Sequence, residues 1–161
     1  MGAEWAVAGW GGGWDTWLCT AVETTGGVSR LAGRESVDAA DMLLLDMKAA
    51  NDPWFSILTG RGMDNTLDIL QHCETTRKPV WIRHVLVPGY TLTEPHLHEL
   101  GRLLRDFACI ERVELLPFHK MGEYKWEALG CPYTLTDTQP PEAAEVARAQ
   151  EILTSYGLSV R

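Results

Sequence analysis

The stretch "MLLLDMK", residues 42 to 48, decides the fold that we expect for this chain. Its apolar run is almost continuous, which is typical of a parallel strand buried on both faces. The run ends in Asp46, Met47 and Lys48. Because side chains alternate along a strand, Leu44, Asp46 and Lys48 share one face. Charges on such a face must be paired or bound to something. The plainest interpretation is an Asp46–Lys48 ion pair at the end of a strand, with Lys48 reaching solvent.

Strand and helix patterns alternate along the chain on both sides of this stretch. Apolar and β-branched runs predict strands in "LCTAVETTGG" (18–27), "DMLLLDMK" (41–48), "PVWIRHVLVPGY" (79–90) and "IERVELLPFH" (110–119). Helical spacing predicts helices in "MDNTLDILQHC" (63–73), "LTEPHLHELGRLLRDFA" (92–108) and "PPEAAEVARAQEILTSYGL" (140–158), and a short helix is an open alternative in "SRLAGRESVDAA" (29–40). Asp64 or Asn65 is expected to cap the first of these helices, and Thr93 the second.

This succession of βα units predicts an α/β fold with a parallel sheet. Such units build either an open, doubly wound sheet or a (β/α) barrel. In both architectures, ligands bind at the carboxyl ends of the strands.

Composition excludes several classes of partner. The chain has 161 residues, a formal net charge of -8 and no basic run. Nucleic-acid binding depends on Lys and Arg that neutralise phosphates, so we expect neither nucleic acid nor an anionic membrane as a partner. The longest apolar runs are strand-sized, and no secretory signal is recognisable, so a membrane-spanning helix is not expected.

The cysteines and the first residues carry separate expectations. Cys19, Cys73, Cys109 and Cys131 are widely spaced, which favours reduced thiols in a cytoplasmic protein. Residues 1–17, "MGAEWAVAGWGGGWDTW", are rich in Trp and Gly and are interpreted as an atypical leader. Residues 18–161 are expected to form one domain.

Polar residues follow or interrupt every predicted strand near its carboxyl end. The first strand ends in Glu23 and Thr24, the second in Asp46 and Lys48, and the fourth in His119. The third carries Arg83, which is expected either to pair with Glu23 or Asp46 or to contact a ligand. Converging polar groups at one end of a parallel sheet are typical of an active site.

Three further histidines, His84, His96 and His98, are not expected in that site. His84 alternates with Arg83 and should face the helical layer. His96 and His98 lie two residues apart on a helix, so they point to different faces and are not expected to bind one metal ion.

Several of these stretches, taken in order, resemble one family. The segments "LLLDMK", "VWIRHVLVPGY" and "VELLPFHKMGEYKWEALG", with the closing "PPEAAEVARAQEILTSYGLSV", resemble the C-terminal part of the pyruvate formate-lyase activating enzymes. These are radical S-adenosylmethionine (SAM) proteins that activate glycyl radical enzymes. The resemblance covers residues 18–161 and implies a partial (β/α)6 barrel. It also implies a 4Fe–4S cluster and SAM as cofactors of the whole protein, and a glycyl radical enzyme of the pyruvate formate-lyase type as partner.

The resemblance also implies roles for individual residues. The strand end Glu23-Thr24-Thr25-Gly26 corresponds to the family's acid-Thr-x-Gly motif. Together with Asp46, Glu23 and Thr24 would hold a monovalent cation beside the SAM carboxylate, for which oxygen ligands are suitable. Lys48 would meet that carboxylate, Arg83 would lie near SAM, and His119 would lie by its methionine or ribose end.

Two motifs of the family have no counterpart in the sequence. The chain contains no CxxxCxxC, the motif whose thiolates ligate the cluster. The Gly-Gly-Glu strand end that binds the SAM amino group is also absent. We therefore expect about the last four βα units of a (β/α)6 barrel, a chain that neither assembles the cluster nor cleaves SAM by itself. The expected partner is then a missing N-terminal half, or a second copy bound through an exposed sheet edge.

Two alternative functions remain open at this point. Lys48 beside Asp46 could form a Schiff base in an aldolase-type barrel, with Asp46 or His119 as the acid or base. The chain could instead be a non-catalytic docking or regulatory half-barrel. Its contact would then be "FHKMGEYKWEALG" (118–130), since Tyr124 and Trp126 are residues that interfaces favour.

Overall fold

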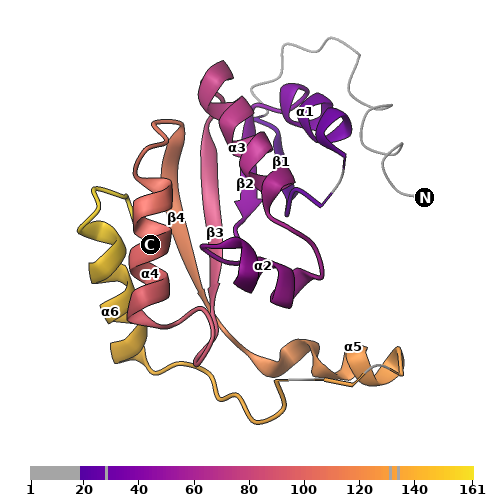
Figure 1. Cartoon of the computed structure of the whole chain (residues 1–161), viewed down its shortest axis with the longest axis vertical. Helices are drawn as coiled ribbons and strands as arrows, with labels where there is room; N and C mark the ends of the chain where they lie inside the picture. The colour runs from indigo at the N-terminus through magenta and orange to yellow at the C-terminus, as the bar shows by residue number, and fades with distance from the viewer. Residues whose placement is uncertain (1–18, 28, 131, 134) are drawn as a thin grey trace.

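A computed structural model describes residues 19–161 except 28, 131 and 134, so the predicted leader at 1–17 lies outside the described residues. The described chain contains one sheet with the strand order β1-β2-β3-β4 (Figure 1). The strands are β1 (Ala21–Thr24), β2 (Met42–Asp46), β3 (Val80–Leu86) and β4 (Ile110–Pro117), and neighbouring strands run parallel. The predicted α/β fold with a parallel sheet is therefore confirmed.

Helices cover one face of the sheet. Along β2 and β3, buried residues alternate with partly exposed ones. The buried side, which includes Leu43 and Ile82, packs with Leu70, Leu100 and Leu153 in a single apolar core. These last three residues belong to α3 (Asp64–Thr76), α4 (Glu94–Leu104) and α6 (Ala143–Thr154). α1 (Arg30–Asp38) completes this layer beside α3 (Figure 1).

The other face of the sheet is only partly covered, which corrects the expectation that β2 is buried on both faces. Met42, Leu44 and Asp46 are partly exposed, whereas Leu43 and Leu45 are fully buried. The continuous apolar run therefore packs against helices through its odd-numbered residues alone. Its even-numbered residues form an open face that carries the polar strand ends.

Helix ends are largely those that the sequence predicts. The short helix at 29–40 is confirmed as α1, capped by the side chain of Ser29. Thr93 is the N-cap residue of α4, although its side chain makes no capping hydrogen bond. The cap predicted for α3 is wrong, because Met63 occupies the N-cap position and Asp64 is the first helical residue.

Two helices were not predicted. α2 (Asp52–Thr59) begins after Asn51, whose side chain accepts a hydrogen bond from the Trp54 amide, and ends at Gly60 with φ +71°. A 3₁₀ turn, η1 (Lys120–Gly122), leads into α5 (Glu123–Ala128), which extends away from the sheet (Figure 1).

The two edges of the described sheet differ. At one edge, the C-terminal residues pair with β4 through a parallel bridge between Val113 and Val160. At the other edge, β1 has β2 as its neighbour among the described strands. The expected association through an exposed edge would use β1 and stays a prediction. In the described part of the chain, every helix is too short or too polar to cross a membrane.

Candidate functional site

The charged pair at the end of β2 is formed as the sequence predicts. The Lys48 Nζ lies 2.9 Å from an Asp46 carboxylate oxygen. The two side chains are 33% and 18% exposed, so both charges are partly desolvated but still reach solvent. Between them, the Met47 side chain turns to the opposite face and is fully buried. The strand therefore anchors itself in the core through Met47 and presents both charges on the open face.

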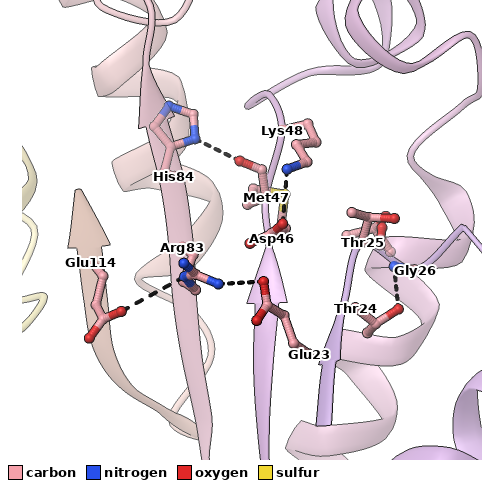
Figure 2. A network of polar contacts seen from close by, with 11 residues as sticks. Glu23, Thr24, Thr25, Gly26, Asp46, Met47, Lys48, Arg83, His84 and Glu114 are labelled. Carbon is pink, nitrogen blue, oxygen red and sulfur yellow. Dashed lines mark hydrogen bonds and ion pairs between the residues drawn. The ribbon is translucent and has the colours of Figure 1, made fainter. Parts of the chain in front are cut away.

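Arg83 connects the neighbouring strands across this open face (Figure 2). Its Cα pairs in register with Asp46 on one side and Glu114 on the other. The guanidinium forms an ion pair with Glu23, and its Nε lies 4.0 Å from a Glu114 oxygen. Of the two partners that the sequence left open, Glu23 is the one whose ion pair with Arg83 is formed.

Glu23 and Thr24 lie on opposite faces of β1. Glu23 is on the open face, whereas the Thr24 hydroxyl accepts a hydrogen bond from the Gly26 amide in the following turn at 3.0 Å (Figure 2). Glu23 and Asp46 thus share a face and Thr24 does not. The Thr24 side chain is therefore not available as a ligand beside the two carboxylates. The oxygen of Thr24 that is suited to bind a cation together with them is its backbone carbonyl.

The turn after β1 is held against the start of α3. The Thr66 hydroxyl donates to the Thr25 carbonyl at 2.8 Å, and Gly26 has a positive φ of 73°. A Cβ on Gly26 would lie 2.7 Å from the Thr66 Cα, which is closer than real atoms approach. Glycine is therefore required here both by backbone conformation and by space.

A cavity of about 640 Å³ lies beside this turn. Its walls are the β1 turn, the end of α2 and the start of α3, and they include Arg61, Asp64 and Asn65. The Arg61 guanidinium donates to the Gly27 carbonyl across the cavity wall. The sequence analysis considered Asp64 and Asn65 only as helix caps and did not place these three residues in a site, because they come from segments whose approach cannot be read from local sequence.

His119 lies at the carboxyl end of β4 but outside the contacts that join the other candidates. Its side chain is exposed, and its Nδ1 accepts a hydrogen bond of 3.4 Å from the Met121 amide. It thus caps the turn that leads into α5. The described contacts join Asp46 with Lys48 and Glu23 with Arg83, and they do not include His119.

His84 lies in the helical layer, as predicted, and His96 and His98 lie on different faces of α4, also as predicted. His84 is fully buried, and its Nδ1 lies 2.7 Å from the Met47 carbonyl oxygen. Its ring stacks on that of His96, with centroids 5.5 Å apart. Burial lowers the pKa of His84 to about 4 and also lowers the pKa of His96, so both rings are neutral near pH 7. His98 instead contacts the Tyr156 hydroxyl at 2.9 Å, on another face of α4.

Two of the described cysteines, Cys73 and Cys109, are buried thiols. Burial raises the pKa of Cys73 to about 11 and, with help from Glu74, that of Cys109 to about 12, which disfavours the thiolate that iron requires. Cys19 is exposed, and Cys131 lies outside the described residues. Within the described ranges, no three His, Cys, Asp or Glu side chains gather as metal ligands.

Arg112, Glu114 and Trp81 extend the polar network on the open face, and the sequence analysis missed them. The Arg112 guanidinium stacks over the Trp81 ring at 3.8 Å and lies 3.4 Å from a Glu114 oxygen. The alternation in "ERVEL" (111–115) could have indicated that Arg112 and Glu114 share a face.

Solved structures define the class of fold. A domain of pyruvate-formate lyase-activating enzyme from Bacteroides vulgatus superposes with a TM-score of 0.72 at 21% identity, covering 89% of this chain and 80% of that one. A radical SAM methyltransferase from Sphaerobacter thermophilus gives 0.68 at 20% identity, covering 88% of this chain and 39% of that one. The chain therefore has the α/β fold of radical SAM domains, consistent with a partial barrel.

Sequence comparison then identifies the relatives. The chain is 35% identical over 143 residues to pyruvate formate-lyase 1-activating enzyme of Escherichia coli K12, covering 88% of this chain and 58% of that protein. It is 40% identical over 113 residues to the Streptococcus mutans pyruvate formate-lyase-activating enzyme, covering 70% of this chain and 43% of that protein. The chain is thus homologous to the pyruvate formate-lyase activating enzymes, as its motifs predicted.

This homology covers part of each relative. The chain spans about half the length of the curated relatives that it matches. No protein-family model matches it.

Proposed function

We propose that this chain contributes the methionine-binding side of the SAM site in an activating enzyme for a glycyl radical enzyme of the pyruvate formate-lyase type. The observation that carries the proposal is the pair of cations on the open face, Lys48 and Arg83, each held beside a carboxylate at the strand ends. The homology over 88% of the chain supports the same assignment. Residues 18–161 then act as one partial barrel domain, in the cytoplasm.

The charges at the strand ends fit the amino-acid end of SAM. That end carries a carboxylate, which suits Lys48, and an ammonium group, which suits an acidic side chain. Lys48 is 33% and Arg83 27% exposed, so an anion can reach both from solvent. His119 lies farther along the same end of the sheet, where it is suited to the methionine or ribose part. SAM, when bound beside a reduced cluster, supplies the radical chemistry of such enzymes.

A monovalent cation would bind between Glu23 and Asp46, with the carbonyl of Thr24 as a further oxygen ligand. This cation would have to compete for Glu23 with Arg83, which forms an ion pair with that carboxylate. Binding of the cation would release Arg83 from Glu23, and the guanidinium would then be available to an anionic ligand. The proposal therefore links cation binding to the freedom of Arg83.

The iron–sulfur cluster is not assigned to this chain. Its described thiols are either buried, with a raised pKa, or far apart in the sequence, and no CxxxCxxC is present. In this proposal, the residues of the chain bind and orient SAM and hold its carboxylate.

The aldolase alternative is less well supported. A Schiff base requires the amine of Lys48 to be free to attack a carbonyl group, but its Nζ is engaged by Asp46 at 2.9 Å. Trapping of a carbonyl substrate on Lys48 by borohydride would nevertheless distinguish the two functions, because the SAM-binding proposal predicts no adduct.

A docking role has one observation in its favour. Four apolar side chains on or next to α5 are between 48% and 76% exposed, namely Met121, Tyr124, Trp126 and Leu129. This helix extends from the sheet end (Figure 1). Exposed aromatic residues of this kind are enriched at interfaces. A contact with the partner lyase at α5 would therefore complement the SAM site. Trp126→Ala should weaken co-purification with a pyruvate formate-lyase, whereas Trp81→Ala on the sheet should not.

Titration with SAM, followed by NMR of the ¹⁵N-labelled chain, tests the proposed site. We expect weak binding, which perturbs the resonances of Asp46, Lys48 and Arg83. Lys48→Met should abolish these shifts. Lys78→Met is the matched control, because Lys78 precedes β3 at the opposite end of the sheet and donates to the Ala40 carbonyl. Shifts that persist in Lys48→Met, or that are lost equally in both variants, would contradict the proposal.

A further inference from the structure

His84 makes a specific contact with the strand end that carries the proposed site. Its Nδ1 lies 2.7 Å from the carbonyl oxygen of Met47, the residue between Asp46 and Lys48 (Figure 2). A carbonyl oxygen only accepts hydrogen bonds, so the imidazole must be the donor. His84 is fully buried, and burial lowers its pKa to about 4. Near pH 7 the ring is therefore neutral and carries its proton on Nδ1.

The hydrogen bond from His84 fixes the peptide group that joins Met47 to Lys48. The Met47 amide donates to the Arg83 carbonyl at 2.9 Å, which continues the ladder between β2 and β3 one residue past Asp46. On the other side of Met47, the carbonyl is held by the His84 ring. Both peptide groups of Met47 are thus attached to consecutive residues of β3. The direction in which the chain leaves the strand, and with it the position of Lys48, follows from these two bonds.

The His84 ring is itself confined. His96 of α4 stacks on it with an interplanar angle of 18°, and His96 is 3% exposed. The Met47 side chain is buried in the same layer, and the backbone of Thr91 also lies close enough to influence the pKa of His84. The imidazole therefore has little room to rotate away from the Met47 carbonyl.

We propose that His84 is a positioning residue for the site, which fixes the Met47–Lys48 peptide through its Nδ1 proton and thereby holds Lys48 and Asp46 together on the open face. Its link to ligand binding rests on the proposed SAM function, but its effect on the strand end does not. A residue that only fills the core would be replaced equally well by any ring of similar size. A positioning residue needs an N–H donor at the place of Nδ1.

Two substitutions separate these roles. His84→Phe keeps a ring in the core and removes the donor, whereas His84→Asn loses ring volume but has an amide N–H near the place of Nδ1. The readout is the backbone ¹⁵N order parameter of Lys48, which needs no ligand. We expect about 0.85 in the parent chain and in His84→Asn, and below about 0.6 in His84→Phe. The order parameter of Ile82, in the middle of β3, should stay high in all three and reports that the sheet is folded.

A rigid Lys48 amide in His84→Phe, or a mobile one in His84→Asn with Ile82 unchanged, would overturn the proposal. If a variant fails to fold, a measurement on the parent chain still tests the role of His84. Long-range ¹H–¹⁵N spectra should show the His84 proton on Nδ1, and a proton on Nε2 would refute the assigned role.

The same variants connect the inference to SAM. If SAM shifts the Lys48 resonance in the parent chain, His84→Phe should weaken that binding at least tenfold, and His84→Asn should restore most of it. Absence of any SAM effect in the parent chain would refute the proposed function, while the order parameters and the tautomer would still decide the role of His84.

Discussion

Replacement of Gly26 by alanine tests how the first strand end is built. Gly26 has a φ of +73°, and a Cβ at this position would lie 2.7 Å from the Cα of Thr66 in α3. An L-residue in the left-handed region costs about 1–2 kcal/mol. Forcing an extra carbon into packed backbone costs about 1–3 kcal/mol more. The free energy of unfolding should therefore fall by about 2–5 kcal/mol.

Gly60→Ala is the matched control for this change. Gly60 ends α2 with a φ of +71°, but nothing lies within 4 Å of the place of its Cβ. In Gly60→Ala, the free energy of unfolding should fall only by the cost of the left-handed conformation, about 1–2 kcal/mol. Urea unfolding followed by circular dichroism measures both values, with the m-value as a check on the cooperativity of unfolding. Equal losses in the two variants would refute the close approach of the β1 turn to α3.

Three further predictions concern acid stability, helix packing and the cluster. Burial lowers the pKa of His84 to about 4, and also that of His96, below the ordinary 6.5. The unfolded chain therefore binds protons first as the pH falls. Stability should decline as the pH falls from about 6.5 to about 4, by up to about 1.4 kcal/mol per pH unit for His84. The lowered pKa of His96 should add to this decline, so urea unfolding of His96→Leu should show a shallower one. Gly101→Ala should destabilise the chain by about 1–3 kcal/mol, because its Cβ would meet the Tyr156 ring at 2.3 Å. The loss should shrink in a Tyr156→Ala background, and an unchanged loss there would exclude this contact as the cause. Reconstitution with iron and sulfide should give no stable cluster absorbance, and a stable absorbance that depends on these cysteines would show the cluster assignment to be wrong.

The sheet could be predicted from the sequence because its signals are local. Each strand is an apolar run closed by a turn or a polar strand end, and the alternation of Leu43, Leu45 and Met47 with Leu44 and Asp46 identifies its two faces. The apolar run of β2 does not indicate whether the second face of this strand is covered. That depends on neighbouring segments of the barrel rather than on β2 itself.

The helices α2 and α5 were missed for different reasons. α2 carries readable signals in Asn51, Pro53 and Gly60, but its eight residues are short beside the neighbouring apolar strands. α5 has six residues and exposed aromatic side chains, so it has little of the buried stripe from which a helix is usually recognised.

The candidate site was predictable only where its contacts are local. Asp46 and Lys48 lie two residues apart on one strand, so their pairing follows from alternation. For Arg83 the sequence left Glu23 and Asp46 open as partners, and it could not choose between them because the pair that is formed joins residues 60 positions apart. The contacts of Glu114 with Arg83 and Arg112 depend on the register of β3 with β4, which shifts between Val80 and Trp81. Such a shift cannot be read from either strand alone.

The central claim is that the strand ends recognise the amino-acid end of SAM through Lys48. The most direct measurement compares SAM with 5'-methylthioadenosine, which lacks that end, in parallel NMR titrations of the chain. SAM should shift the Lys48 and Asp46 resonances, and 5'-methylthioadenosine should leave them unchanged. Equal shifts with both compounds, or none with SAM, would contradict it.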